Sequence, residues 1–180
     1  MVERDWVAVV TGGTCEECGL QTSGVPRDGL GTALGEEAAS WVELLASASI
    51  SALTRHQVPG WSALEYAAHA RDVLRVFADR IERALVEEQP SFGWWDHEAA
   101  VVDEAYNAQD PHEVGAVLAE RADRMAMIIS RLGPEQWTRA GIRGEDQVFT
   151  VEGLARFALH EIRHHRYDAG VRVRTVAADG

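Results

Sequence analysis

The sequence lacks the features that mark nucleic-acid-binding and membrane proteins. Its 180 residues include 17 basic and 29 acidic side chains, which gives a formal net charge of −12. Nucleic acids and anionic lipid surfaces are bound through clustered Lys and Arg, so this excess of acid argues against both partners. No apolar run approaches the roughly 20 residues that a transmembrane helix needs. We therefore expect neither a nucleic-acid nor a membrane partner.

Signal-peptide features and a disulfide framework are also missing. The first ten residues, MVERDWVAVV, do not combine a basic n-region with a long apolar segment, so a cytoplasmic location is expected. The only two cysteines, Cys15 and Cys18, lie three residues apart and cannot make a disulfide framework. In a reducing compartment such a pair indicates metal or redox chemistry.

The composition, with 46% hydrophobic and 26% charged residues, is typical of one soluble domain with a core. Residues 1–31 are rich in glycine and other turn formers, and we predict an irregular arm that carries both cysteines. Residues 32–172 are predicted to form a helical bundle, and residues 173–180 a C-terminal tail. No internal repeat or linker indicates a second domain.

Capping signals define the predicted helices. Ser62 and Glu65 form a capping box, and Pro111 follows Asp110 at a first helical position. Apolar residues three and four positions apart accompany these signals. The predicted helices cover about residues 32–56, 62–88, 96–107 and 110–132, with a last one from residue 150 onward. Four sizeable helices and one short helix predict an all-α four-helix bundle.

The clearest chemical signal lies near the C-terminus, where His160, Glu161 and His164 form an H-E-x-x-H pattern. Two histidines four residues apart share one face of a helix and can bind one metal ion. In zinc proteases the glutamate of this pattern is the general base, and a third ligand is needed after it. Only 16 residues follow His164, with no glutamate and no histidine except His165. A protease of this type is therefore disfavoured, and two hydrogen-bonded core histidines are the alternative without a metal.

A third ligand is available upstream. His69 interrupts the inward-facing apolar stripe of the helix predicted over residues 62–88. Burying an imidazole without a partner is costly, so a ligand or a hydrogen bond must satisfy it. His69 from this helix, with His160 and His164 from the last, would make a three-histidine site with open positions for water or substrate.

Three segments carry a resemblance to a known family. WSALEYAAHARDVLRVFADRI resembles the helix of DinB/YfiT-like proteins that carries their first metal-binding histidine. ALHEIRHHRYD resembles their closing helix, with two more histidines in an H-x-x-x-H arrangement. PSFGWWDHEAAVVDEAYNAQDP is similar to an actinobacterial branch whose members also carry an N-terminal C-x-x-C-G, as Cys15 to Gly19 does here. The resemblance covers nearly the whole chain.

The resemblance implies a DinB-like four-helix bundle in which His69, His160 and His164 hold a divalent metal. Zinc is the expected metal, with nickel or iron as alternatives. Characterised relatives include S-transferases that use mycothiol or bacillithiol, and a mycothiol-dependent maleylpyruvate isomerase. A metal lowers the pKa of a bound thiol and delivers a thiolate at neutral pH. Glu161 or His165 would then move the proton, although Glu161 could equally face solvent.

The leading hypothesis is a metal-dependent enzyme that transfers a low-molecular-weight thiol, as co-substrate, to an electrophilic small molecule. A hydrolase or lyase that uses metal-bound water is the enzymatic alternative. The partner expected in each case is a small molecule, and a homodimer is allowed.

The role of Cys15 and Cys18 stays open. C-x-x-C-G is half of a zinc knuckle, and no second C-x-x-C exists to complete a four-cysteine site. The pair could share a metal with histidine or carboxylate ligands, form a redox dithiol, or consist of two ordinary thiols. If both sulfurs filled the open positions of the histidine site, that site would be closed, and a non-catalytic metal-binding protein would result.

Overall fold

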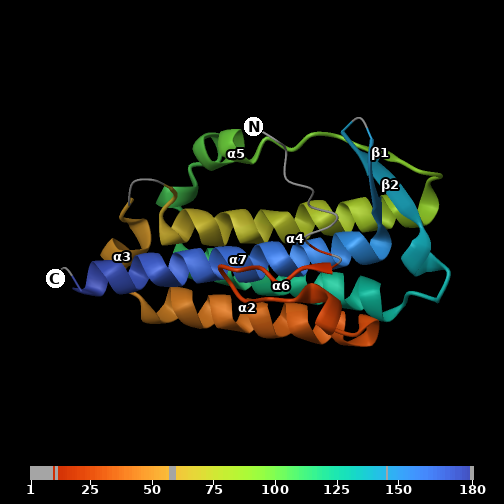
Figure 1. Cartoon of the computed structure of the whole chain (residues 1–180). Helices are drawn as coiled ribbons and strands as arrows, with labels where there is room; N and C mark the ends of the chain where they lie inside the picture. The colour runs from red at the N-terminus through yellow and green to blue at the C-terminus, as the bar shows by residue number, and fades with distance from the viewer. Residues whose placement is uncertain (1–9, 11, 57–59, 145, 179–180) are drawn as a thin grey trace.

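The fold was obtained as a computed structural model that describes residues 10, 12–56, 60–144 and 146–178, with side chains up to residue 170. Four long helices make the bundle predicted from the sequence (Figure 1). They are α2 (Leu30–Ser47), α4 (Ala63–Val86), α6 (Pro111–Ser130) and α7 (Val151–Ala178). Helices α2 and α4 each pack against both α6 and α7. The first two long helices of the chain, α2 and α4, therefore lie at opposite corners of the bundle.

Short elements surround the bundle. Helix α3 (Ile50–Thr54) follows α2, and α5 (His97–Asp103) lies along α4 (Figure 1). A three-stranded sheet stands at one end of the bundle, with β1 (Ser91–Phe92) parallel to β2 (Ala140–Arg143) and β2 antiparallel to β3 (Gln147–Thr150). Four single turns of 3-10 helix complete the described elements: η1 (Thr22–Gly24), η2 (Arg27–Gly29), η3 (Tyr106–Ala108) and η4 (Gln136–Thr138).

The helix starts follow the capping signals in the sequence. The Ser62 hydroxyl accepts from the Glu65 N–H at 3.1 Å, and the Glu65 carboxylate accepts from the Ser62 N–H at 2.7 Å, so the predicted capping box begins α4. Asp110 caps α6 with Pro111 at its first position. Thr150 Oγ1 accepts from the N–H of Gly153 at 3.0 Å in the first turn of α7.

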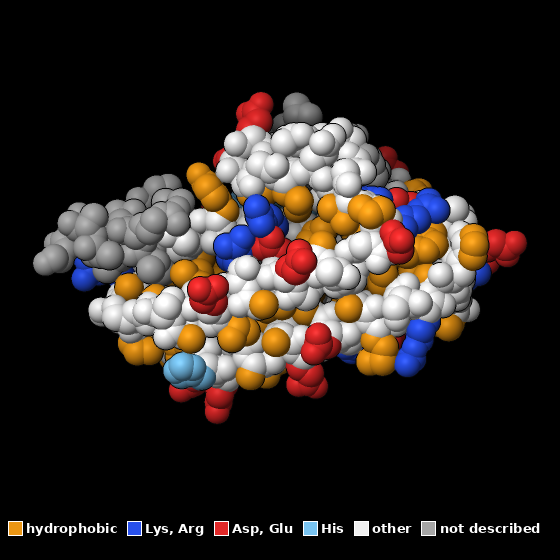
Figure 2. Space-filling view, turned by 90° about the horizontal axis from the view of Figure 1, so that it is seen from below, with side chains coloured by type: hydrophobic (Ala, Val, Ile, Leu, Met, Phe, Trp, Pro, Cys, Tyr) orange, Lys and Arg blue, Asp and Glu red, His pale blue; other side chains and the backbone are white. Residues whose placement is uncertain are grey.

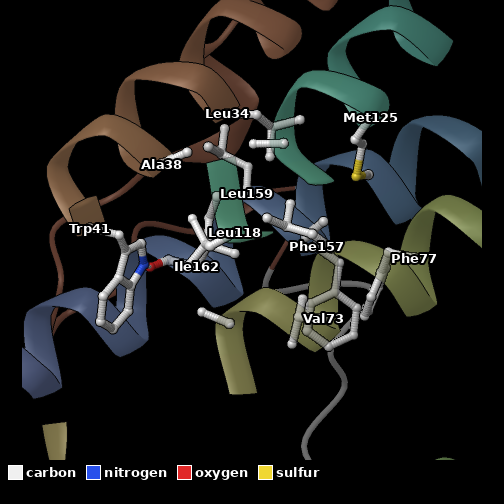
Figure 3. Packing of buried hydrophobic residues seen from close by; sticks show 14 of the residues in the cluster. Leu34, Ala38, Trp41, Val73, Phe77, Leu118, Met125, Phe157, Leu159 and Ile162 are labelled. Atoms are coloured by element: carbon white, nitrogen blue, oxygen red, sulfur yellow. The ribbon is translucent and has the colours of Figure 1, made fainter. Parts of the chain in front are cut away.

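The core fills the space between the four helices (Figure 3). Its labelled members come from every long helix of the bundle: Leu34, Ala38, Trp41, Val73, Phe77, Leu118, Met125, Phe157, Leu159 and Ile162. The fully buried Trp41 donates from Nε1 to the Ile162 carbonyl at 2.9 Å, so its indole leaves no unpaired donor in the core. A buried carboxylate, Asp72, accepts from Arg71, Arg121 and Tyr106 and thereby ties α4 to α6 and η3.

The structure differs from the sequence prediction at several helix boundaries. The helix predicted over residues 32–56 is interrupted, because Ser49 takes an extended conformation and caps α3 as a separate helix. The helix predicted over residues 96–107 ends at Asp103, and η3 follows it. Helix α7 continues to Ala178, beyond the predicted bundle end at residue 172.

The described part of the arm, residues 12–29, lies across α7 (Figure 1). Arg156 of α7 donates to the carbonyls of Thr22 and Val25. Arg27 forms an ion pair with Glu152, also in α7, at 2.6 Å. Residues 13–29 of the arm contain only turns apart from η1 and η2. Residues 1–9 and 11 lie outside the described part.

The surface seen from below the bundle mixes charges of both signs. In the coloured part of Figure 2, basic side chains lie beside acidic ones and apolar side chains are dispersed among them. None of the helices in the described ranges has an apolar stretch long enough to cross a membrane.

Candidate metal centres

Helix α7 presents two overlapping pairs of side chains four residues apart. His160 and His164 form one pair, and Glu161 and His165 form the other. The pairs are offset by one residue, which is a rotation of about 100° around a helix axis. The two pairs therefore occupy neighbouring faces of α7, and each face meets a different part of the chain.

The first face of α7 meets the N-terminal arm. Cys15, Cys18, His160 and His164 each offer one ligand atom, and these atoms all lie within 4.8 Å of one another. Cys15 Sγ is 3.5 Å from Nδ1 of His164. The rings of His160 and His164 are stacked, with their centroids 5.3 Å apart. We call these four residues the Cys–His cluster.

The two thiols of this cluster differ in acidity. Burial raises the pKa of Cys15, but the N–H groups of Cys18 and Glu17 and the His160 side chain outweigh burial and lower this pKa to about 6. Burial raises the pKa of Cys18 to about 11, and the neighbouring Cys15 adds to the rise. At neutral pH, without a metal, the pair thus shares one negative charge.

The second face of α7 meets α4. His69, Glu161 and His165 also bring one ligand atom each within 4.8 Å of the others. The rings of His69 and His165 approach edge to face, with their centroids 4.8 Å apart. Glu161 Oε2 is 3.5 Å from Nε2 of His165. We call these three residues the His–Glu cluster.

The surroundings of the His–Glu cluster prepare it for a cation. His69 is only 4% exposed, and its Nδ1 has no hydrogen-bond partner among the described residues. Burial, reinforced by the charge of His165, lowers the pKa of His69 to about 3, which keeps this imidazole neutral. The His165 ring is held by Asp168, whose Oδ2 is 3.3 Å from Nδ1. A carboxylate on the far nitrogen is the usual support of a metal-binding histidine.

The protonation states of Glu161 and His165 are linked. Burial raises the pKa of Glu161, but hydrogen bonds from His160 and His165 outweigh it and hold this pKa below its usual range. Burial lowers the pKa of His165, but the hydrogen bond to Asp168 and the charge of Glu161 outweigh it and raise this pKa to about 9. Without a metal, His165 is therefore protonated, and its imidazolium provides the positive charge beside the Glu161 carboxylate.

The His–Glu cluster opens into a pocket of about 370 Å³. Most of the pocket wall comes from α4, α7 and the segment that leads into α5. Six aromatic side chains line it: Trp61, Tyr66, Phe77, Trp94, Trp95 and Phe157. The His69 ring stacks on Trp95 at 5.2 Å, and Tyr66 stacks on His165 at 5.3 Å. The cluster is thus accessible to a small molecule through an apolar pocket, a typical form of ligand site.

Two arginines, Arg80 and Arg143, line the same pocket. Within the described ranges neither forms an ion pair with a carboxylate. Arg80 donates to the Gly93 carbonyl at 3.1 Å, and Arg143 lies over the Trp94 ring at 5.5 Å. Burial and the charge of Arg143 lower the pKa of Arg80 to about 10, so the side chain stays charged at neutral pH. This end of the pocket is therefore suited to an anion.

The structure divides the three histidines that the sequence placed in one site. His160 and His164 meet the cysteines, whereas His69 meets Glu161 and His165. Cys15 and Cys18, whose role the sequence left open, lie beside two histidines. The sequence predicted that His69 shares a site with His160 and His164. In the structure these three histidines belong to two different clusters.

Other pocket residues were missed by sequence reasoning. His97, which the sequence analysis did not single out, lines the pocket, and its ring lies 5.6 Å from that of His69. Its place beside Trp94 and Trp95, just after the Asp96 cap, was the available signal. Arg163 and Arg166, also on α7, form ion pairs with Glu37.

Comparison with known families places the fold. The family model of the DinB superfamily matches residues 33–169, well over half of the chain. The chain belongs to the DinB superfamily. This match confirms the family that the sequence resemblance indicated, together with its four-helix bundle.

One solved structure with a similar fold is YfiT from Bacillus subtilis, described as a probable metal-dependent hydrolase with an unusual four-helix bundle topology. Its TM-score is 0.77 at 21% identity, and the alignment covers 84% of this DinB-superfamily chain and 87% of YfiT. A search of curated proteins found no significant match. At this identity the likeness shows that the two proteins share a fold and no more. The diagonal placement of α2 and α4 agrees with the bundle topology that is described as unusual in YfiT.

Proposed function

We propose that this DinB-superfamily protein is a metal-dependent enzyme that hydrolyses small anionic molecules with an apolar body. In this proposal His69, Glu161 and His165 hold the metal. One observation carries it. The buried imidazole of His69, whose Nδ1 has no hydrogen-bond partner within the described ranges, lies beside a carboxylate and a second imidazole in the wall of an open pocket. Two histidines with one glutamate are the protein ligands of several hydrolytic zinc enzymes.

The donor set fits a divalent metal. His69 is already neutral, Glu161 is ionised, and Asp168 orients His165. When bound, such a metal polarises the substrate and lowers the pKa of a water or thiol nucleophile. Three protein ligands leave further positions for that nucleophile and the substrate. Glu161 and His165, which the sequence suggested as proton carriers, serve as ligands in this proposal.

Proton transfer then falls to another pocket residue. His97 lies 5.6 Å, ring to ring, from His69, and it is partly exposed at the start of α5. An imidazole with access to solvent can take a proton from the nucleophile and pass it to the leaving group. Trp61 and Trp95 pack around the same two histidines, so they limit the access of bulk water to the reacting atoms.

The arginines define the substrate class. His69 and Arg80 are eleven residues apart on α4, which corresponds to about 16 Å along a helix axis. The anionic group of the substrate would therefore bind several bonds away from the bond that is cleaved. Guanidinium groups bind carboxylates through charge-assisted hydrogen bonds, and the aromatic walls between the two ends accept an apolar chain.

Transfer to a small thiol is the second candidate, and it matches the chemistry that the sequence resemblance implies. The pocket volume of about 370 Å³ leaves space for a thiol beside a small electrophile. Hydrolysis and thiol transfer would use the same ligands and differ in the nucleophile. The description of YfiT as a probable metal-dependent hydrolase supports the first candidate.

A substrate series tests the proposal. Metal-loaded protein would be assayed with 4-nitrophenyl monoesters of dicarboxylic acids of increasing length, from succinate to suberate, and with the neutral hexanoate ester. We expect faster release of nitrophenolate from an anionic ester of intermediate or greater length than from the neutral one. Arg143→Gln should raise KM for the anionic ester by about 10-fold or more, the value of one charge-assisted hydrogen bond, and leave the neutral ester unaffected.

Matched variants identify the catalytic residues. His69→Ala and Glu161→Ala should abolish activity, whereas His112→Ala, an exposed histidine at the start of α6, should retain it. Parallel assays of a chlorodinitrobenzene-type electrophile with and without mycothiol or bacillithiol separate thiol transfer from hydrolysis. A protein that binds a metal at the His–Glu cluster but accelerates neither reaction would contradict the proposal and favour a binding function.

A further inference from the structure

The Cys–His cluster has the composition and spacing of a closed zinc site. With zinc bonds of about 2.0–2.3 Å, the ligand atoms of a tetrahedral site lie about 3.3–3.8 Å apart. Cys15 Sγ and His164 Nδ1 are already 3.5 Å apart, and all four ligand atoms lie within 4.8 Å of one another. A shift of less than about 1.5 Å would complete the tetrahedron.

The backbone around the cysteines has the form of a metal-binding turn. Gly19 N–H donates to the Cys15 carbonyl at 2.8 Å, and Cys15 N–H donates to the Leu20 carbonyl at 2.9 Å. Gly19 has a φ of +72°, a conformation that disfavours any other residue.

The histidine side of the cluster is supported by carboxylates. Glu17, between the two cysteines, places Oε2 3.2 Å from Nε2 of His164. His164 is therefore oriented with Nδ1 toward Cys15 and Nε2 toward a carboxylate. Nδ1 of His160 is 3.6 Å from the Glu161 carboxylate. Carboxylates in this position orient metal-binding imidazoles and increase their basicity.

We propose that the Cys–His cluster binds a structural zinc ion that fastens the N-terminal arm to α7. Two thiolates and two imidazoles fill the four positions of a tetrahedral zinc ion, so this site has no room for substrate. It is separate from the His–Glu cluster, which has three ligands and opens into the pocket. The chain would thus bind one closed and one open metal ion on neighbouring faces of α7.

The arm has few other contacts around the cysteines. Among residues 12–21, Cys15 is the only buried side chain, and Leu20 is partly buried against the core. The arm is held on either side of this segment, by Val10 in the core and by the contacts of Arg156 and Arg27 near Thr22 and Val25. A zinc ion would fix the segment between these anchors and position Glu17 beside His164, at the edge of the pocket.

Metal content tests this proposal directly. The full chain, loaded with zinc and freed of excess metal, should carry one equivalent that Cys15→Ser/Cys18→Ser lacks. His69→Ala should keep that equivalent, and His112→Ala should match the wild type. Cobalt in place of zinc should show a thiolate-to-cobalt charge-transfer band in the wild type and His69→Ala but not in the double serine variant. Because Cys15 and Cys18 lie outside the pocket lining, failure of this test would leave the His–Glu proposal intact.

A second measurement uses the wild type alone, so it does not depend on the folding of a variant. Titration of both thiols with a mercurial reagent should release one zinc ion, detected with a chromophoric chelator. Cleavage after Glu16 or Glu17 by a glutamate-specific protease should be slow with zinc and accelerate at least 10-fold when zinc is removed. Two thiols that react freely without releasing zinc, or a disulfide between the two cysteines in the zinc-treated protein, would overturn the proposal.

Discussion

Asp168 lies beside a histidine of each cluster, so its replacement should affect metal binding at both. Its Oδ2 lies 3.3 Å from Nδ1 of His165 in the His–Glu cluster and 3.6 Å from Nε2 of His164 in the Cys–His cluster. Loss of a carboxylate behind a metal-binding histidine weakens metal affinity about 10- to 100-fold. Asp168→Asn should therefore weaken metal binding at both sites, and the loss of binding free energy at each should not exceed about 1.4–2.7 kcal/mol.

The two sites should respond unequally. His164 keeps a nearer carboxylate, Glu17 at 3.2 Å, so the Cys–His cluster should lose less than the His–Glu cluster. The size of the loss should also depend on pH, because Asp168 helps to raise the pKa of His165 to about 9. At pH 7 the Asp168 carboxylate stabilises the proton on His165 as well as the metal that competes with this proton. Its removal therefore weakens metal binding less at pH 7 than at a pH where His165 is already neutral.

The assay is a competition titration of metal-free protein against a chromophoric chelator, at pH 7 and at about pH 9.5, above the pKa of His165. Asp103→Asn, an exposed aspartate at the end of α5, is the matched control. We expect the largest loss at the His–Glu cluster at the higher pH. An equal loss at both pH values, or a larger loss at the Cys–His cluster, would refute the reasoning.

Three further predictions concern acidity and the core. In the wild type, the affinity of the His–Glu cluster should rise about tenfold per pH unit from pH 7 to about 9, because the raised pKa of His165 makes a proton compete with the metal; a flat titration would contradict this. Asp72→Ala should cost about 3–5 kcal/mol in urea unfolding at pH 7, since it removes the buried carboxylate that pairs with the partly buried guanidinium groups of Arg71 and Arg121. The pKa of Asp72 is held below its ordinary 3.8 (burial raises it, but Arg71 and its other partners outweigh burial), so its contribution should persist above about pH 4 and fade as the pH falls through the lower folded value. Trp41→Phe should cost about 1–3 kcal/mol, because it removes the buried hydrogen bond to the Ile162 carbonyl and leaves a void beside the smaller ring. A change within about 0.5 kcal/mol would show that neither the hydrogen bond nor the larger ring is needed.

The bundle was predictable because its signals are local. Ser62, Asp110 and Pro111 mark helix starts through hydrogen bonds or geometry within one turn, and the structure has all three. The parallel contact of β1 with β2 was not predictable, since Ser91 and Ile142 pair across about 50 residues of sequence. Gly141 permits this contact, because a Cβ there would collide with the Phe92 ring, and such a tertiary reason leaves no pattern in the sequence.

The candidate ligands could be singled out from the sequence, but their grouping could not. HEIRHH contains two pairs with the same spacing, and spacing alone does not tell which pair faces α4. The two possible orientations of α7 differ by a rotation of about 100° about its axis. The apolar stripe of the helix is too broad to distinguish between them. The packing of α7 resolves it by directing His165 toward His69 and His160 toward Cys15. The cysteines therefore leave the cluster in the pocket open, whereas closure of a shared site by both cysteines was one of the alternatives that the sequence left open.

The central claim, that α7 carries two metal sites on neighbouring faces, is tested most directly by anomalous diffraction from crystals of the zinc-loaded full chain at the zinc absorption edge. We predict two anomalous peaks. One should lie among the Cys–His cluster with four protein ligands, and the other among the His–Glu cluster with three and an opening to the pocket. A single peak bound by His69, His160 and His164 together would contradict the account.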